Sequence, residues 1–219
     1  MTMSPQEASA RCRAICGMAP VIPVLVVDDV AHARPLAEAL VAGGLPVLEV
    51  TLRTPAALAA IAEMARVPGA VVGAGTLLRP DDVTAAVAAG ATFGVSPGAT
   101  DALIDAALAA GLPLLPGAVT ASEVMHLLER GFDMLKFFPA EPAGGRAALS
   151  ALAGPLPQAA FCPTGGITAA NAPGYLALQN VVCVGGSWVA PKTMLAAGDR
   201  AGITALARAA AALREGPAL

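Results

Sequence analysis

The sequence is poor in aromatic residues and in charge, and both shortages exclude classes of protein. Aromatic residues make up 3% and charged residues 13% of the 219 positions, and the formal net charge is −3. Proteins that bind nucleic acids usually carry a basic surface and aromatic rings that stack on bases. We therefore expect no nucleic-acid partner.

Long apolar segments are also missing, although 56% of the residues are hydrophobic. No run of about 18 apolar residues is free of Gly, Pro and charge, so no segment is expected to span a membrane. Residues 1–13 contain Glu7 and Arg11 and lack the apolar core of a signal peptide. These absences predict a cytoplasmic protein without a membrane partner.

Residues that ligate metals are few, with four cysteines and two histidines. Cys12 and Cys16 lie one helical turn apart and could hold an ion, but free cysteine is more often a packing residue. Cys162 and Cys183 fall in strand-like runs and are expected to be reduced core thiols. Neither histidine has a partner at ligand spacing. The sequence therefore predicts no metal site.

Strand-like and helix-like segments alternate along the chain without a linker, which predicts one α/β domain over residues 1–219. An extra N-terminal helix is expected within residues 1–17. Thr54 is expected to cap a helix that runs to Arg66. Residues 215–219 are expected to be a frayed tail.

The repeating unit of the chain is one strand followed by one helix. Helices are expected to end at Gly90, Gly111 and Gly131, which are 21 and then 20 residues apart, about one compact strand–helix unit. Eight such units favour a closed (β/α)8 TIM barrel over an open doubly wound sheet. The expected strands are 21–27, 46–52, 70–74, 92–96, 113–117, 133–138, 159–163 and 180–184.

One of the two lysines lies inside an apolar segment. Lys192 follows a proline in a polar stretch and is interpreted as an ordinary surface charge, whereas Lys136 lies in the expected strand 133–138. A buried ammonium is costly, and burial favours the uncharged amine, a nucleophile that can form a Schiff base. Taken alone, however, the position favours a lysine at a strand end whose ammonium reaches water.

A carboxylate and a guanidinium share one face of the second expected strand. Alternation along this strand places Glu49, Thr51 and Arg53 on the same side, near the carboxyl end where barrel enzymes build their sites. A structural ion pair would produce the same pattern. The set is therefore a hypothesis for a site that needs further support.

That support comes from glycine pairs at the ends of the last two expected strands. Each of the pairs at 165–166 and 185–186 has a hydroxyl residue within the next two positions and can present backbone N–H groups to an anion. The loops after strands seven and eight are the usual phosphate site of such barrels. An anion cradle, an arginine, a carboxylate and a buried lysine suit a phosphorylated 2-keto acid. The combination favours Lys136 as a nucleophile.

Six segments, in order over nearly the whole chain, form one set of motifs: 48–54, 73–76, 96–98, 136–141, 161–167 and 185–188. Together they resemble the 2-keto-3-deoxy-6-phosphogluconate aldolase family of class I pyruvate aldolases. The resemblance implies a lyase of the Entner–Doudoroff pathway that cleaves 2-dehydro-3-deoxy-6-phospho-D-gluconate to pyruvate and D-glyceraldehyde 3-phosphate. It also implies a homotrimer, and an enzyme that needs neither a metal nor another cofactor.

The resemblance further implies a role for each matching residue. Lys136 would attack the C2 ketone and form the iminium that accepts electrons when C3–C4 breaks. Glu49 would move protons, and Arg53 would hold the substrate carboxylate. The expected pyruvate pocket consists of Thr76, Pro97, Phe138 and Thr164, and the expected phosphate site consists of Gly165, Gly166, Gly186 and Ser187.

Three alternatives stay open at this point. A related pyruvate aldolase would cleave 4-hydroxy-2-oxoglutarate or the galactonate-derived epimer, because stereochemistry at C4 cannot be read from these residues. A phosphosugar isomerase on the same barrel would use Lys136 without a covalent imine. A barrel that only binds a ligand would use neither Lys136 nor Glu49 for catalysis.

Overall fold

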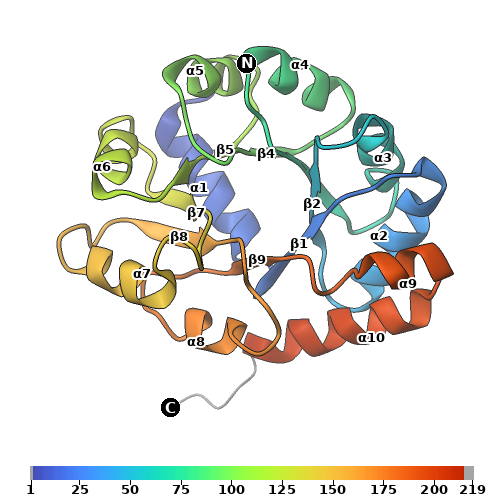
Figure 1. Ribbon diagram of the computed structural model, residues 1–219. Coiled ribbons are helices and arrows are strands. Elements are labelled where there is room, and N and C mark those ends of the chain that lie inside the picture. Colours follow the sequence, from blue (N-terminus) through green and yellow to red (C-terminus); the bar gives the residue numbers. More distant parts are fainter. Residues whose placement is uncertain (1, 215–219) are drawn as a thin grey trace.

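The computed structural model describes residues 2–214, and the strands in this range pair in parallel (Figure 1). They are β1 Val21–Leu25, β2 Val47–Thr51, β3 Val71–Gly75, β4 Phe93–Val95, β5 Leu114–Leu115, β6 Gly117–Ala118, β7 Met134–Phe137, β8 Ala160–Pro163 and β9 Val184–Gly186.

The strands curl around a common axis, with most helices outside them (Figure 1). One sheet has the order β5-β4-β3-β2-β1-β9 and the other has the order β6-β7-β8. An isolated parallel bridge between Thr164 and Gly185 connects the end of β8 with β9. At the other junction, Pro116 separates β5 from β6, and its carbonyl accepts a 2.9 Å hydrogen bond from the Lys136 N–H.

The helices follow the strands as the sequence predicts. They are α1 Pro5–Cys16, α2 Ala33–Ala42, α3 Ala57–Met64, α4 Pro80–Ala88, α5 Asp101–Ala109, α6 Ala121–Glu129, α7 Gly145–Ala153, α8 Ala172–Leu176, α9 Lys192–Ala197 and α10 Arg200–Ala211, with short 3-10 turns η1 Val30–His32 and η2 Ala212–Arg214. No helix in the described range is long and apolar enough to cross a membrane. The tail predicted at 215–219 lies outside the described residues.

Most expected boundaries lie within a few residues of those observed. Helices α4, α5 and α6 each end two residues before the glycines expected to stop them, Gly90, Gly111 and Gly131. The cap predicted at Thr54 is wrong. Its hydroxyl donates a 2.5 Å hydrogen bond to the carbonyl of Val27, and α3 begins only three residues later.

Two expected strands differ from the observed ones. The strand predicted at 113–117 is divided into β5 and β6, because Pro116 has no N–H to contribute to a ladder. The strand predicted at 180–184 begins only at Val184. The N–H of Val182 still bonds to β8, through the carbonyl of Phe161 at 3.0 Å, so the chain crosses to β1 only after that residue.

An inner apolar cluster lies within the curl of the strands. It contains Cys12 and Cys16 from α1 together with Cys162 and Cys183, and it is separate from the larger cluster between the strands and the helices. All four thiols are free and buried, which confirms the prediction that they are core residues. Burial raises the pKa of Cys12.

Helix α1 closes the amino ends of the strands. The Ser9 hydroxyl donates a 2.6 Å hydrogen bond to Asp133 and accepts one of 3.0 Å from the N–H of Met134, the first residue of β7. Arg13 adds an ion pair to Asp133 at 3.2 Å. The carboxyl ends of the strands lie at the opposite end, where the polar residues of the predicted site gather.

Candidate active site

Lys136 and Glu49 meet inside the curl of the strands although they are 87 positions apart. The Lys136 Nζ lies 3.1 Å from Glu49 Oε1, and the two side chains are 6% and 4% exposed. Strand β7 holds Lys136 in register with Gly117 on β6 and Cys162 on β8. Because both charged groups are almost completely shielded from water, each one depends on the other to offset its cost of desolvation.

Space for the Glu49 carboxylate comes from a missing side chain on the neighbouring strand. A Cβ atom at Gly75 would lie 2.4 Å from Glu49 Oε1, closer than real contacts allow. The lysine also has an aromatic neighbour, since its Nζ lies 5.2 Å from the centre of the Phe138 ring. The pair is therefore enclosed on several sides by β3 and by the residue after β7.

Arg53 and Thr76 come together just beyond β2 and β3. The Arg53 Nε donates a long hydrogen bond of 3.4 Å to the Thr76 hydroxyl, and Arg53 itself is exposed. Thr76 has φ +63°, the only positive φ of a non-glycine residue in the described range. Such backbone strain is frequent at functional sites. Thr51, on the same face of β2, instead donates its hydroxyl to the Leu25 carbonyl at 3.0 Å.

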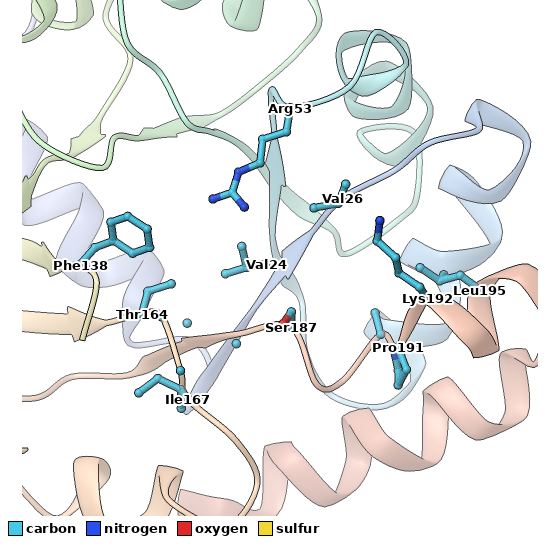
Figure 2. A pocket seen from close by; sticks show the side chains of 15 residues that line it. Val24, Val26, Arg53, Phe138, Thr164, Ile167, Ser187, Pro191, Lys192 and Leu195 are labelled. Carbon is cyan, nitrogen blue, oxygen red and sulfur yellow. The ribbon is translucent and has the colours of Figure 1, made fainter. Parts of the chain in front are cut away.

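A cavity of about 340 Å³ opens at the carboxyl ends of β1, β8 and β9 (Figure 2). Figure 2 shows the Arg53 guanidinium pointing into it, with Phe138 and Thr164 on the opposite wall. This volume suits a small ligand. The lining consists of Val24, Val26, Arg53, Phe138, Thr164, Gly165, Gly166, Ile167, Gly185, Gly186, Ser187, Ala190, Pro191, Lys192 and Leu195.

The remaining predicted site residues lie behind or beside this lining. Lys136 and Glu49 are buried and do not line the cavity themselves; the Lys136 Nζ lies 5.2 Å from the ring of Phe138, which does. Thr76 does not line the cavity but accepts a hydrogen bond from Arg53, which does. Pro97 lies against Gly117, where an added Cβ would be 2.2 Å from the Pro97 carbonyl oxygen, and Gly117 is the register partner of Lys136.

The loop after β8 is shaped by two consecutive glycines in the left-handed region. Gly165 has φ +101° and Gly166 has φ +80°, values that residues with a side chain rarely adopt. The Gly165 carbonyl accepts a 3.0 Å hydrogen bond from the Glu141 N–H, and the Gly166 carbonyl accepts one of 3.0 Å from the Asn171 side chain. The loop is thus fixed on both sides.

A buried tyrosine supports the same loop from behind. The Tyr175 hydroxyl donates a short hydrogen bond to Glu141 Oε1. Burial, reinforced by that bond, raises the pKa of Tyr175, so the phenol stays a donor. The side chain of Glu141 in turn lies so close to Gly166 that a Cβ there would approach its Cγ to 2.6 Å. Tyr175 therefore positions the loop through Glu141.

The sequence interpretation missed Lys192 and the β1 residues of the lining. Lys192 was expected to be an ordinary surface charge, but it lies at the cavity rim, with its Nζ 3.6 Å from Asp28 Oδ2. Val24 and Val26 could have been found by extending the alternation of β1 to its carboxyl end. No group of three or more His, Cys, Asp or Glu side chains placed to hold a metal occurs among the described residues.

Comparisons with known proteins agree on one family. Residues 12–206 match the family of KDPG and KHG aldolases. The KHG/KDPG aldolase of Escherichia coli (strain K12) is 54% identical over 192 residues, covering 87% of this chain and 90% of the relative.

Two solved structures extend this similarity to the fold. The 2-keto-3-deoxy-6-phosphogluconate aldolase of Zymomonas mobilis ZM4, crystallised with 3-phosphoglycerate, has a TM-score of 0.89 and 53% identity over 94% of this chain and 97% of that one. The KDPG aldolase of Legionella pneumophila, with pyruvate captured as a covalent carbinolamine, has a TM-score of 0.88 and 46% identity over 91% and 97% of the two chains.

Proposed function

The chain belongs to the KDPG and KHG aldolase family, and from this premise we propose that it is a class I aldolase acting through Lys136. It cleaves 2-dehydro-3-deoxy-6-phospho-D-gluconate, the substrate of the Entner–Doudoroff pathway, to pyruvate and D-glyceraldehyde 3-phosphate. The observation that carries this proposal is the buried pair of Lys136 and Glu49, 3.1 Å apart and next to Phe138 of the cavity wall.

The pair supplies a nucleophile and a base in one contact. When Glu49 takes a proton from the Lys136 ammonium, the free amine attacks the C2 ketone and forms a carbinolamine. The carbinolamine captured with pyruvate in the Legionella relative supports this step. Loss of water then gives a protonated imine at C2, and no metal is needed to accept electrons.

Cleavage follows from the iminium. Glu49, acting directly or through a water, removes the proton of the C4 hydroxyl. The C3–C4 bond breaks, its electrons move to the iminium to form an enamine, and the aldehyde product leaves. Protonation of the enamine at C3 and hydrolysis of the imine release pyruvate and restore the amine of Lys136.

The residues around the cavity hold the two ends of the substrate. Arg53 binds the carboxylate, for which its planar fork of donors is suited. Thr76, Pro97, Phe138 and Thr164 enclose the pyruvate moiety. The backbone N–H groups of Gly165, Gly166 and Gly186 and the Ser187 side chain bind the phosphate. The 3-phosphoglycerate in the Zymomonas structure supports a phosphorylated ligand.

The architecture behind this site is a closed eight-stranded barrel within a single domain, 1–219. Strands β5 and β6 count as one strand interrupted at Pro116, and the bridge between Thr164 and Gly185 joins β8 to β9. With these two junctions, each strand has a neighbour on both sides. The curl visible in Figure 1 supports the same arrangement.

We also propose a cytoplasmic homotrimer. Three large apolar side chains are candidates for a subunit contact: Leu58 of α3, Leu78 of the loop between β3 and α4, and Val87 of α4, which are 37%, 57% and 40% exposed. Light scattering coupled to size exclusion should give three times the 21.5 kDa chain mass. A monomer would contradict this part of the proposal.

Cleavage of 4-hydroxy-2-oxoglutarate is a second candidate activity. The Escherichia coli relative carries both substrates in its name. The distal carboxylate of that substrate would lie where the phosphate binds. Comparable kcat/KM values for both substrates would support the double activity, and turnover of only the phosphorylated one would exclude it.

The test of the proposed mechanism is borohydride trapping with pyruvate, read by intact mass and peptide mapping. A reduced pyruvyl adduct on Lys136 is the expected result. A folded protein that gives no adduct would contradict the Schiff base and favour the isomerase or the ligand-binding alternative.

A further inference from the structure

Lys192 lines the cavity, yet neither its sequence context nor the resemblance to the family gives it a function. Among the described residues that line the cavity, only Arg53 and Lys192 carry a charge, and both are cations. Arg53 lies beside Thr76, on the side where the proposed mechanism places the substrate carboxylate. Lys192 lies five positions after Ser187, on the segment that continues from the proposed phosphate site.

We propose that Lys192 is a specificity residue that binds the distal anionic group of the substrate and makes the cavity prefer a dianion. This inference rests on the proposed function, because it concerns the distal end of the same substrate. A phosphate monoester carries a charge of about −1.5 to −2 at neutral pH. The glycine N–H groups and the Ser187 side chain are neutral donors, and a charge-assisted hydrogen bond is roughly twice as strong as a neutral one.

The present partner of Lys192 leaves the ammonium free to move. Its Nζ is 3.6 Å from Asp28 Oδ2, and the two side chains are 74% and 68% exposed. Exposed ion pairs of this kind are weak, and the lysine stem is flexible. Figure 2 shows the amine on the Val26 side of the cavity rim, away from Ser187. When a phosphate enters, the ammonium turns from Asp28 to the phosphate, and the two anions compete for it.

The test measures how strongly substitution of Lys192 lowers kcat/KM for substrates that differ in the charge of their distal group. Three substrates form a series: the 6-phosphorylated keto acid, 4-hydroxy-2-oxoglutarate with one distal carboxylate, and unphosphorylated 2-keto-3-deoxygluconate with no distal charge. The variants are Lys192→Met, which keeps the stem, and Lys192→Arg, which keeps the charge. Arg66→Gln is the matched control, since Arg66 is an exposed cation that also has an acidic partner, Glu63 at 2.7 Å.

Lys192→Met should lower kcat/KM for the phosphorylated substrate by about tenfold or more, mainly through KM, as expected for the loss of one charge-assisted hydrogen bond. The loss should shrink along the series as the distal charge falls. Lys192→Arg should restore most of the preference. Equal losses on all three substrates, or a response no larger than that of Arg66→Gln, would overturn the inference.

A second measurement keeps this test separate from the test of the aldolase reaction. Binding of inorganic phosphate, followed by calorimetry, requires no turnover. Lys192→Met should weaken it, and Asp28→Asn should strengthen it about twofold to threefold by removing the competing carboxylate. If cleavage fails but this response is seen, the proposed reaction is wrong and the anion site stands. If cleavage is seen without this response, the reaction stands and the role of Lys192 is wrong.

Discussion

The two lysines of this chain have the same chemistry and opposite surroundings. The side chain of Lys136 is 6% exposed and lies 3.1 Å from a carboxylate that is itself 4% exposed. The side chain of Lys192 is 74% exposed and lies 3.6 Å from a carboxylate that is 68% exposed. Each lysine thus has an acidic partner. What differs is the amount of water around the pair.

The difference determines what each pair can do. In the dry pair, neither charge is solvated, so transfer of one proton from the ammonium to the carboxylate removes two buried charges together. In the exposed pair of Lys192 and Asp28, both ions are solvated and the contact is weak, so Lys192 can exchange one anionic partner for another. Burial therefore suits Lys136 for covalent chemistry, and exposure suits Lys192 for recognition.

Substitution of the buried lysine should have the largest effect. Lys136→Ala should reduce turnover on the order of a thousandfold or more, because the other lysine of the chain, Lys192, is 74% exposed at the cavity rim and cannot form the imine in its place. Cleavage assays and borohydride trapping with pyruvate check this. Lys192→Met is the control, since it also removes a lysine amine but should still form the adduct. An adduct on Lys136→Ala would contradict the assignment.

Loss of the buried carboxylate should have the next largest effect. Glu49→Gln keeps the shape and a polar contact with Lys136 but removes the base, so turnover should fall about 10²-fold to 10⁴-fold. Slow trapping with pyruvate should persist, because imine formation can use water. Rapid-quench measurement of the trapping rate separates the two effects. Turnover near that of the unsubstituted protein would exclude Glu49 from the mechanism.

Much of the buried site could be predicted because it depends on local pattern and topology. Alternation along β2 places Glu49 on the inner face, and alternation along β7 does the same for Lys136. Parallel strands bring their carboxyl ends to the same edge of the sheet. The approach of Glu49 and Lys136 could therefore be predicted without a map of residue contacts. The observed 3.1 Å contact confirms that they meet, whereas their catalytic roles stay predictions.

The exposed part of the site could not be predicted in the same way. Whether Lys192 faces a cavity depends on how the loop from β9 to α9 is placed against β1, which no periodicity describes. The hydroxyl of Thr54 could equally cap a helix or bond across to Val27, and only the packing of neighbouring units decides between them. Long-range contacts made by loops are therefore the part of the site that the sequence pattern does not predict.

A smaller change should disturb the buried pair without removing either member. Gly75→Ala places a Cβ 2.4 Å from Glu49 Oε1, so the carboxylate must move away from Lys136. We expect turnover to fall about tenfold to a hundredfold, as a displacement of about 1 Å can cost that much. Gly98→Ala is the matched control, since a Cβ there meets nothing within 4 Å. Equal activity of the two variants would show that the Glu49 geometry is not critical.

The smallest effect is expected from the buried support of the phosphate loop. Tyr175→Phe removes the hydroxyl that donates to Glu141 while keeping the buried ring. The free energy of unfolding should fall by about 1 kcal/mol, the usual net value of one hydrogen bond. Because Glu141 packs against Gly166, KM for the phosphorylated substrate should rise a few fold, whereas the pyruvate trapping rate should stay unchanged.

This last variant separates two ways of recognising the same phosphate. Lys192 acts through charge, so the effect of Lys192→Met should shrink as added salt screens the interaction. Tyr175 acts through the shape of the loop, so the effect of Tyr175→Phe should be nearly independent of salt. Kinetics at low and high ionic strength, with urea unfolding as the check on stability, distinguish them. If added salt reduces both effects equally, Tyr175 also acts on the phosphate through electrostatics. The distinction between a loop that binds by its shape and a lysine that binds by its charge would then be wrong.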